Sequence, residues 1–436
     1  MPVAAPGIVL ERLQGLPGGE VLLELAGERE DVDLVGGAVR DLLLGRTPRE
    51  LDIVVGGEGA SLARAAPTLA NQLASRLNVL AGEDVTSVNE HERFITAAVK
   101  WDRGQIDIAT RRAESYGAPG ALPDVSAGTE EKDLERRDFT INAIAIRLGG
   151  ERRGELRAVP DALSDLEQRR LRVLHEQSFG DDPTRLLRMA RYQARLGFAV
   201  EDHTAALAAA AVATRALDTV SGARIGAELR LALAEDDAVA SLVAMDDLGL
   251  LDALHPRLRF EEPVARATLA LLPEDGRPDL ALLASLLLPL ALRAGDDPRA
   301  EIGALLDRWD FPAADRDRVA AATVAVPRLI EELPAAERPS RLRTVAAGVP
   351  LEGVALAGAL GAQESARRWL QDTRHIHLEI TGDDLLMAGV PEGPEIGQRL
   401  EAVLKLRLDG ELPNGREAEL NMALTRVAEE GEHERG

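Results

Sequence analysis

The sequence predicts an α+β multidomain protein, with a mixed α/β domain at the N-terminus followed by all-helical domains. Three observations support this fold class. The first third of the chain alternates short apolar strand patterns with glycine turns and helical segments, whereas the pattern beyond residue 198 is almost wholly helical. At 436 residues the chain is too long for one ordinary hydrophobic core. Roughly two to four domains are therefore expected.

A glycine turn is the first feature of the N-terminal domain. A short apolar strand pattern ends at Gly36 and Gly37, and residues 38–44 read as the start of a helix. Paired glycines let backbone N–H groups approach a phosphate, and the N-terminus of the following helix adds a favourable dipole. Taken alone, such a pair is more often a plain tight turn.

Two carboxylates follow this turn. Residues 45–48 break the helix, and a second strand pattern begins at Glu50. Because successive side chains of a strand point to opposite faces, we expect Glu50 and Asp52 to point the same way. Two carboxylates beside a phosphate-binding turn suit Mg²⁺ ions that also hold a nucleoside triphosphate. The order and closeness of turn and acids favour such a site over a solvated acidic pair.

This stretch resembles the first motif of the class II tRNA nucleotidyltransferase and poly(A) polymerase family, a GGxVRD turn followed by a strand with two aspartates. The matching residues are Gly36, Gly37, Val39, Arg40, Asp41 and Asp52. Glu50 departs from the pattern, since the family has aspartate there. The resemblance implies a nucleotidyltransferase head of the polymerase-β-like type, with Glu50 and Asp52 as metal ligands and Gly36, Gly37, Arg40 and Asp41 at the nucleotide.

Further elements of the head are predicted from local patterns. Residues 8–28 read as a helix interrupted at residues 17–19, and residues 61–77 read as an amphipathic helix. A strand pair is expected at residues 94–101 and 105–110. Asp107, between Ile106 and Ile108, is a candidate third catalytic carboxylate that helps to deprotonate the attacking hydroxyl. An edge-strand acid that faces water fits the same pattern equally well.

Residues 111–132 show no apolar period, and long loops of this kind are usually functional or disordered. The family has a flexible loop in this region, which is linked to switching between nucleotides. Residues 115–123 resemble members that add only part of the tRNA tail, or poly(A)-type relatives, more than single enzymes that add the full CCA.

Residues 136–143, RRDFTINA, match the family's second motif, RRDFTxNA. Two guanidiniums and an amide after a loop suit the oxygens of a ribose and a triphosphate. The alternative for the block alone is a charged helix start with Asp138 as its cap. The resemblance implies that Arg137, Asp138 and Asn142 bind the nucleotide.

A third block covers residues 181–198. It predicts a helix with an aspartate cap, Pro183 in the first turn and Gly197 as terminator. The block resembles the family's EDxxR motif, with Asp181 in place of Glu. Asp182 and Arg185 lie three residues apart, hence on one helix face, where a surface ion pair is the alternative. The resemblance implies nucleotide contacts from Asp181, Asp182, Arg185, Arg188 and Arg191.

The chemistry of the Asp182–Arg185 pair selects bases. Cytosine and adenine each present an amino donor beside an unprotonated ring nitrogen, whereas uracil and guanine present the reverse. A carboxylate accepts and a guanidinium donates. Facing acceptors or facing donors would cost on the order of 1 to 3 kcal/mol for each buried mismatch. Such a pair would admit C and A without a nucleic-acid template.

The remaining chain is predicted to be helical, with segments at 202–217, 221–234 and 238–248 and further helices to about residue 370. Residues 221–229 are a degenerate form of the family's ERIxxEL block, which we interpret as helix packing. From residue 377 onward, with a helix at 395–408, the chain resembles the family's tail, which contacts the tRNA elbow. The expected domains are a head (1–148), a neck with the base-recognition helix (149–260), a body (261–375) and a tRNA-binding tail (376–436).

Composition limits the alternatives. The chain has no cysteine, which excludes disulfides, a thiol nucleophile and cysteine-ligated metals. Residues 1–17 lack a secretory pattern, and the longest apolar run, residues 280–292, is too short to span a bilayer and contains Pro289. We therefore expect a cytoplasmic protein without membrane contact.

The charge distribution bears on nucleic-acid binding. The net charge of −23 argues, on its face, against a polyanionic partner. The basic residues are nevertheless mostly arginine, which suits bidentate phosphate and base contacts. An arginine-biased genome would give the same excess. The densest groups are Arg169, Arg170 and Arg172, and Arg185, Arg188, Arg191 and Arg195.

The resemblance implies a Mg²⁺-dependent enzyme that adds C and/or A from CTP and ATP to the 3′ end of tRNA and releases pyrophosphate. The tRNA would be held at its acceptor stem and elbow, and no obligate protein partner is inferred. Alternatives are a partial enzyme that adds only CC or only A, and a poly(A) polymerase. From a different class, a catalytically decayed RNA-binding protein on the same scaffold is the remaining hypothesis.

Overall fold

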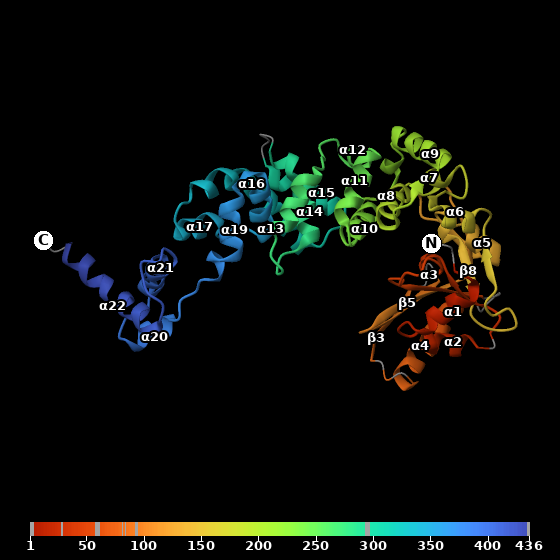
Figure 1. Ribbon diagram of the computed structural model, residues 1–436, viewed down its shortest axis with the longest axis horizontal. Helices are drawn as coiled ribbons and strands as arrows, with labels where there is room; N and C mark the ends of the chain where they lie inside the picture. Colours follow the sequence, from red (N-terminus) through yellow and green to blue (C-terminus); the bar gives the residue numbers. More distant parts are fainter. Residues whose placement is uncertain are drawn as a thin grey trace. The chain divides into compact units, whose positions relative to one another are not determined.

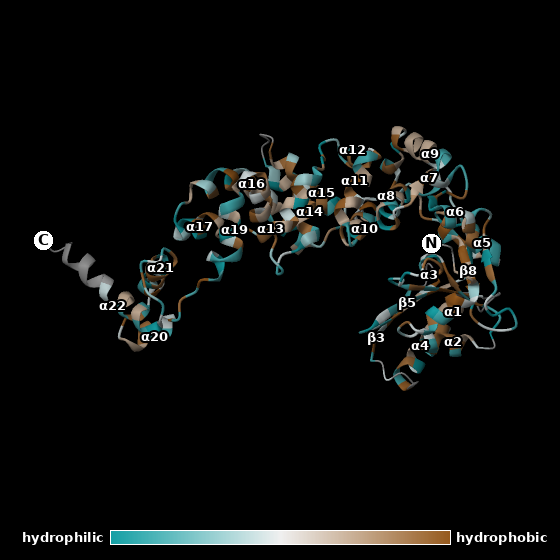
Figure 2. Ribbon diagram, in the orientation of Figure 1, coloured by the Kyte–Doolittle hydropathy of each residue, from teal (hydrophilic) through white to brown (hydrophobic). Residues whose placement is uncertain are grey.

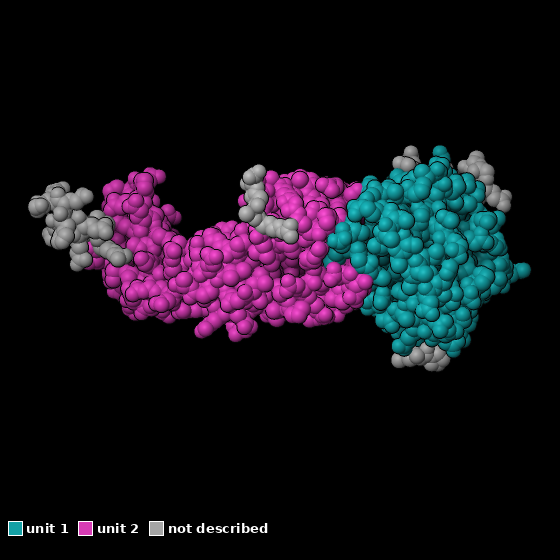
Figure 3. Space-filling model, turned by 90° about the horizontal axis from the view of Figure 1, so that it is seen from above, with its two compact units in different colours: residues 1–221, 248–253 teal, residues 222–247, 254–436 magenta. Residues whose placement is uncertain are grey.

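The computed structural model describes residues 4–27, 29–56, 62–80, 82, 84–91, 95–292 and 297–433. The chain divides into two compact units (Figure 3). The head unit comprises Met1–Ser221 and Leu248–Ala253, and the helical unit comprises Gly222–Asp247 and Leu254–Gly436. The boundary between them falls inside the predicted neck, and the finer division into four domains stays a prediction.

A mixed seven-stranded sheet forms the centre of the head unit, in the order β3-β4-β5-β2-β1-β8-β9. Its strands are β1 (Val32–Val35), β2 (Leu51–Val55), β3 (Val85–His91), β4 (Thr96–Trp101), β5 (Gly104–Thr110), β8 (Ile144–Arg147) and β9 (Leu156–Ala158). Strands β2 and β5 pair in parallel, with Asp52 opposite Asp107, and β1 pairs antiparallel to β2. The predicted mixed α/β head is confirmed.

Helices accompany this sheet in the red and orange part of Figure 1. They are α1 (Pro6–Gln14), α2 (Gly19–Ala26), α3 (Gly37–Leu43), α4 (Leu62–Leu80) and α5 (Glu130–Glu135). Helices α1 and α2 confirm the predicted interruption. Helix α4 packs against β4 and β5 and buries Leu69, Leu73 and Leu77 completely. Residue 28, at the end of the first predicted helix, residue 61 and residue 94 lie outside the described residues.

The prediction that residues 111–132 lack regular structure was wrong. Strands β6 (Arg112–Ser115) and β7 (Asp124–Ala127) pair antiparallel, and α5 follows directly. Glu114 of β6 accepts hydrogen bonds from Arg112 at 3.1 Å and from Arg136 at 3.0 Å. Charged side chains thus hold this hairpin in place, so its strands leave no apolar alternation in the sequence.

The base-recognition block lies in the second half of the head unit. The elements there are η3 (Thr140–Asn142), α6 (Ala162–Gln168), β10 (Arg170–Leu171), α7 (Ser178–Asp181), α8 (Thr184–Leu196), β11 (Ala199–Val200), α9 (Asp202–Ala213) and η4 (Ala216–Thr219). Asp182 accepts a hydrogen bond from the backbone N–H of Thr184 at 3.0 Å, and Gly197 ends α8 with φ 68°. The predicted terminator of α8 is confirmed. The predicted aspartate cap was wrong, because Pro183 occupies the cap position and Asp182 bonds to the first residue of the helix from one position earlier.

The helical unit consists of α10 (Gly222–Leu233), α11 (Ala238–Asp247), α12 (Leu250–Leu254, which begins in the head unit), α13 (Glu262–Leu271), α14 (Pro278–Ala291), α15 (Pro298–Arg308), α16 (Ala313–Ala335), α17 (Pro339–Ala346), α18 (Leu351–Ala357), η5 (Gly358–Ala362), α19 (Gln363–Gln371), η6 (Thr373–His375), α20 (Gly382–Met387), α21 (Pro394–Leu408) and α22 (Arg416–His433). Helix α14, mostly brown in Figure 2, is buried along most of its length and forms the core with α16 and α18. Within the described residues, no single helix meets the length and hydropathy of a membrane span, although one bent pair (Pro339–Ala346 with Leu351–His375) does.

Two packing details bear on the sequence blocks. A Cβ atom on Gly226 would lie 1.7 Å from the carbonyl oxygen of Trp309, so only glycine allows α10 to approach this closely. The packing role expected for residues 221–229 is thereby confirmed. In the tail, α20, α21 and α22 share a small core of their own, formed by Ile380, Leu385, Val390, Val403, Leu412 and Ala423. The predicted helix at 395–408 is present as α21.

Candidate active site

The glycine turn joins β1 to α3, as predicted. Gly36 has φ 70°, and a Cβ atom there would lie 2.8 Å from Nη1 of Arg137 and 3.7 Å from Oδ2 of Asp52. Glycine is therefore required both for the backbone conformation and for the close approach of Arg137. The turn, the guanidinium and the carboxylate lie next to one another, although they come from three separate parts of the sequence.

Asp52 is the electrostatic centre of the site. Burial, the negative charge of Glu50 and that of Asp107 raise its pKa to about 7, against the opposing effect of Arg137. Carboxylates that lie close together in a partly buried site repel one another, and a bound cation stabilises their ionised form. Their donor atoms are oxygens, the ligands that Mg²⁺ prefers. The residues present therefore fit a divalent cation.

Glu50 lies differently from the sequence expectation. Strand β2 begins at Leu51, so Glu50 is an exposed residue of the preceding bend and lies outside the predicted strand. Its charge still acts on Asp52. No cluster of three or more His, Asp or Glu side chains able to hold a metal occurs within the described ranges. The assignment of Glu50 and Asp52 as metal ligands stays a prediction.

Asp107 lines a cleft and does not lie on an edge strand, because β5 runs between β4 and β2. The cleft has a volume of about 410 Å³ and is also lined by Asp52, Lys100, Arg136 and Arg137. Both carboxylate oxygens of Asp107 accept hydrogen bonds from Nε2 of Gln105 at 2.8 Å. Burial raises the pKa of Asp107 despite this bond. The alternative of a solvent-facing edge acid was wrong.

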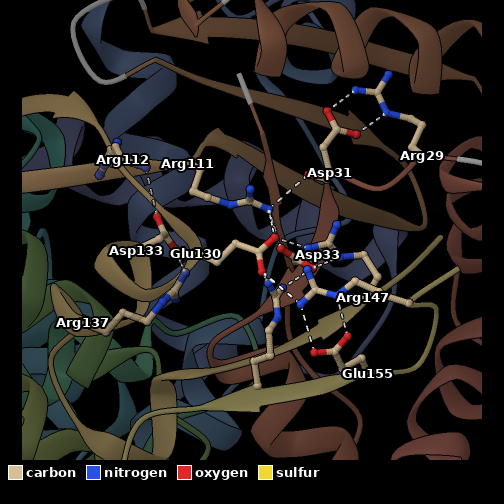
Figure 4. Close-up of polar contacts among 12 residues, drawn as sticks. Arg29, Asp31, Asp33, Arg111, Arg112, Glu130, Asp133, Arg137, Arg147 and Glu155 are labelled. Carbon is tan, nitrogen blue, oxygen red and sulfur yellow. Dashed lines mark hydrogen bonds and ion pairs between the residues drawn. The ribbon is translucent and has the colours of Figure 1, made fainter. Parts of the chain in front are cut away.

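Asp133 fixes the two arginines of the RRDFTINA block. Its carboxylate pairs with Arg136 at 2.8 Å. It also pairs with Arg137 at 3.0 Å (Figure 4). Burial alone would raise the pKa of Asp133, but the two guanidiniums lower it overall. A buried carboxylate thus holds Arg137 beside the glycine turn.

A second network in Figure 4 joins β1, β8 and Arg111, the residue after β5, to α5. Asp33 of β1 pairs with Arg147 at 2.7 Å and with Arg111 at 2.8 Å, and Arg147 also contacts Glu130 of α5. Arg147 and Asp33 are almost fully buried. This network anchors the helix from which Asp133 reaches the two arginines.

Asp138 accepts hydrogen bonds from both the RRDFTINA block and α8. Its carboxylate accepts hydrogen bonds from the backbone N–H of Phe139 at 2.8 Å, from Nδ2 of Asn142 at 2.9 Å and from Nε of Arg188 at 2.8 Å. Burial would raise the pKa of Asp138, but Arg188 and the Asn142 bond lower it to about 2. Asp138 caps no α-helix, because η3 begins at Thr140. The cap alternative was therefore wrong.

Arg40 and Asp41 of α3 are buried and bonded to each other. Nε and Nη2 of Arg40 donate to the two oxygens of Asp41 at 2.8 and 3.0 Å, and Nη1 donates to Oδ1 of Asn142 at 2.6 Å. Arg195 also pairs with Asp41 at 3.2 Å. These bonds fix Asn142 from the side opposite Asp138. Direct nucleotide contacts of Arg40 and Asp41 stay predictions.

The base-recognition pair lies near the β6–β7 hairpin. Asp182 accepts from the Thr184 hydroxyl at 2.6 Å, and Arg185 donates to Oγ of Ser178 at 2.6 Å and to the carbonyl of Arg136 at 3.0 Å. Burial and the charge of Glu114 raise the pKa of Tyr116 to about 12, with Arg185 opposing and Asp182 adding to the shift. The hairpin, the RRDFTINA block and α8 thus converge.

Asp181 lies at the end of α7, a short helix that precedes α8. Its carboxylate lies 3.9 Å from Nε2 of His175. Sequence reasoning missed other residues of the site, namely Lys100, Gln105, Glu114, Asp133 and Tyr192. Asp133 carried a signal, since it precedes Arg136 and Arg137 by three and four residues at the end of a helix. Tyr192 follows Arg188 by four residues, which gives the same helical spacing.

Comparison with known proteins supports this interpretation. Residues 32–172 match the family described as the poly A polymerase head domain, and residues 197–261 match the probable RNA and SrmB-binding site of polymerase A. The CC-adding tRNA nucleotidyltransferase of Deinococcus radiodurans is 36% identical over 298 residues, which cover 66% of this chain and 74% of that protein.

Two A-adding tRNA nucleotidyltransferases are also similar. That of Geobacter sulfurreducens is 34% identical over 89% of this chain and 44% of its own length, and that of Halalkalibacterium halodurans is 40% identical over 54% and 52%. The chain thus spans about half of the length of these two relatives. Among solved structures, the Thermotoga maritima CCA-adding enzyme in complex with tRNA has a TM-score of 0.73 at 26% identity, covering 98% of this chain and 100% of that one. These similarities show that the chain belongs to the tRNA nucleotidyltransferase and poly(A) polymerase family.

Proposed function

We propose that the protein is a tRNA nucleotidyltransferase that adds C and/or A to the 3′ end of tRNA from CTP and ATP, without a nucleic-acid template, and releases pyrophosphate. One observation carries the proposal, namely the cleft in which Asp52, Asp107 and Arg137 meet. Related solved structures are described as CCA-adding enzymes with CTP, with ATP and with tRNA. A cytoplasmic location, where tRNA matures, is part of the same proposal.

Mg²⁺ is the cofactor that this proposal requires. Glu50 and Asp52 would hold it, because Asp52 lines the cleft and the charge of Glu50 acts on Asp52. When bound, the ion supplies Lewis-acid neutralisation of the triphosphate charge. Arg137, held by Asp133 beside Gly36, would bind phosphate oxygens.

The proposed reaction is an in-line displacement. The 3′ oxygen of the tRNA attacks the α-phosphorus, and the bond to the pyrophosphate oxygen breaks. The hydroxyl proton passes to a carboxylate of the cleft, for which Asp107 is the candidate because burial raises its pKa. Arg137 would stabilise the charge on the departing pyrophosphate.

Base choice would rest on Asp182 and Arg185. Asp182 would accept the amino hydrogen of C or A, and Arg185 would donate to the ring nitrogen. The bonds from Arg185 to Ser178 and to Arg136 use two of the five N–H hydrogens of a guanidinium. These two bonds to the protein also fix the orientation of the Arg185 guanidinium.

The Asp182–Arg185 proposal has a direct test. Arg185→Ala and Asp182→Ala should keep transfer of CMP or AMP, while misincorporation of U and G rises about 10- to 100-fold, as expected for the loss of a buried polar match. Competition between labelled nucleotides would measure this ratio. Arg170→Ala, which removes an exposed arginine of β10, is the matched control. Unchanged base choice in both variants would refute the assignment.

A narrower activity is favoured by the relatives. The Geobacter, Halalkalibacterium and Aquifex proteins that are 34–40% identical to this chain are all A-adding enzymes. A form that adds only the terminal A is therefore the second candidate. The CC-adding relative from Deinococcus supports the CC-only form in the same way.

End-sequencing of three tRNA substrates separates these activities. The substrates end at the discriminator base, at C and at CC, and each is incubated with CTP, ATP or both in the presence of Mg²⁺. Complete CCA on the first substrate identifies a full CCA-adding enzyme, addition of A to the CC-ended tRNA alone identifies an A-adding enzyme, and arrest at CC identifies a CC-adding enzyme. Long A tails would identify a poly(A) polymerase. No extension would favour the RNA-binding hypothesis and refute the proposal.

A further inference from the structure

We propose that Tyr192 is a positioning residue for nucleotide binding, whose ring holds Arg40, Arg188 and Arg191 as one cluster of cations. The inference rests on the proposed function, since it assigns that cluster to the triphosphate of the incoming nucleotide. The sequence analysis gave Tyr192 no role, and the ring itself carries no charge with which to bind a phosphate. Its contribution would act through the three arginines.

The geometry around Tyr192 is that of a ring between cations. The Cζ atoms of the guanidiniums lie 5.4 Å (Arg40), 5.6 Å (Arg188) and 5.0 Å (Arg191) from the ring centroid. These distances are within the range in which a guanidinium is attracted to the negative face of an aromatic ring. The ring is 8% exposed, so the attraction is weakly screened by water.

The other contacts of Tyr192 fix its orientation. Phe139 packs against it in a T-shaped arrangement, with ring centroids 5.8 Å apart and planes at 86°. Nη2 of Arg188 donates a hydrogen bond to the Tyr192 hydroxyl at 3.0 Å. Phe139 belongs to the RRDFTINA block, so the ring connects α8 with that block.

The three arginines come from different elements and reach the same block. Arg40 of α3 bonds to Asn142, and Arg188 of α8 bonds to Asp138. Like charges gathered in a buried site repel one another unless something between them compensates. Asp41 and Asp138 already pair with Arg40 and Arg188, so two of the three guanidiniums have a counter-ion. The ring attracts all three guanidiniums without adding further negative charge, which would cancel the positive charge that a triphosphate needs. This difference is the reason to assign a function to an aromatic residue at position 192.

Replacement of the ring in the full chain tests the role. Leucine removes the π face, phenylalanine keeps it without the hydroxyl, and pentafluorophenylalanine keeps the shape but reverses the charge of the face. With Tyr192→Leu and with pentafluorophenylalanine, we expect KM for CTP or ATP to rise about tenfold, as for the loss of cation–π attraction. KM for tRNA should change less than about twofold, and Tyr192→Phe should stay within about threefold of the wild type. Phe198→Leu, which removes a buried ring that follows α8, is the matched control.

Calorimetric titration with inorganic triphosphate provides a second readout that does not need transfer activity. Affinity should fall in the leucine and pentafluorophenylalanine variants and persist in the phenylalanine variant. Equal values for pentafluorophenylalanine and phenylalanine would overturn the inference, as would equal rises of the KM values for nucleotide and tRNA. If the leucine variant does not fold, the comparison of the phenylalanine and pentafluorophenylalanine variants still tests the role of the ring. Absence of triphosphate and nucleotide binding in the wild type would instead overturn the proposed function.

Discussion

Glu352 of the helical unit and Asp52 of the head unit are both carboxylates withdrawn from water, yet their surroundings differ. The oxygens of Glu352 accept hydrogen bonds from Nε and Nη2 of Arg318, both at 2.9 Å, and from the backbone N–H of Arg277 at 2.8 Å. Asp52 instead has Glu50 and Asp107 as neighbours, which help to raise its pKa to about 7. One carboxylate has its counter-ion built into the fold, and the other is crowded by charges of its own sign.

The difference separates two uses of buried charge. A bidentate arginine satisfies Glu352 and joins α16 to α18 at a fixed geometry. At Asp52 the fold bears an unfavourable repulsion that a cation would relieve, as expected where a site is shaped for a ligand. The same contrast exists inside the head unit, where Asp133 and Asp138 are satisfied by arginines. The crowded carboxylate, Asp52, is therefore the one that we propose for the chemistry, and the paired carboxylates support its surroundings.

The largest effect is expected from Asp52→Asn. The replacement keeps the shape but removes the charge that would hold Mg²⁺, so the rate of nucleotide addition should fall about 10³-fold or more. Single-turnover incorporation of labelled CMP or AMP into tRNA would measure it. A rate within tenfold of the wild type would show that Asp52 is not a metal ligand. The crowding of Asp52 would then have no functional meaning in the comparison with Glu352.

Much of the cleft could be predicted from the sequence, because its parts are local. The turn at Gly36 requires a positive φ, and β2 is a short run of apolar and β-branched residues interrupted only by Asp52. The bounds of helix α8 could be predicted from Asp182, which bonds to its first residue, and from Gly197, which ends it. The meeting of the glycine turn, Asp52 and Arg137 was implied by the family resemblance alone.

The rest depended on tertiary contacts. The β6–β7 hairpin is held by the Glu114–Arg136 pair, which joins residues 22 positions apart and leaves no periodic signal. Strand β2 begins at Leu51, one residue later than predicted, so Glu50 lies outside it. Strand ends of this kind are set by pairing, here with β1 and β5. Tyr192 was missed because its role depends on Arg40, which is distant in sequence.

Glu352→Gln tests the structural half of the comparison. Glu352 is buried, whereas the side chain of Arg318 is 38% exposed and stays in contact with water. Loss of the Glu352 charge therefore weakens a bidentate, charge-assisted pair without burying an unpaired charge, and the free energy of unfolding should fall by about 2 kcal/mol. Thermal melting followed by circular dichroism would measure this. Nucleotide addition at 25 °C by the folded variant should be unchanged. Loss of activity without loss of stability would contradict the division between the two carboxylates.

The pH dependence of stability should differ between wild type and Asp52→Asn. Because the pKa of Asp52 is raised from 3.8 to about 7, its protonated form favours the fold, fully below about pH 4, and this contribution is lost as the pH rises through about 7. In metal-free buffer, the asparagine variant should therefore melt at a higher temperature than the wild type at pH 8, with a smaller difference at pH 5. Mg²⁺ should narrow the gap at pH 8 by stabilising the wild type. Parallel melting curves at both pH values would show that Asp52 carries no repulsion.

The smallest effect is expected from Glu332→Gln, the same chemical change at an exposed position of α16. Glu332 pairs with Arg328 one helical turn away at 2.9 Å, and both side chains are about half exposed, at 41% and 45%. Water and salt screen such a pair, so the free energy of unfolding should fall by only about 0.3 kcal/mol. Arg318 and Arg328 belong to one helix, so the two Glu→Gln variants remove the same charge from partners on the same helix. They differ in the burial of the glutamate, which is 0% exposed at position 352 and 41% exposed at position 332. Equal losses of stability at positions 332 and 352, measured in the same melting experiment, would show that the built-in counter-ion of Glu352 stabilises the fold no more than a surface contact does.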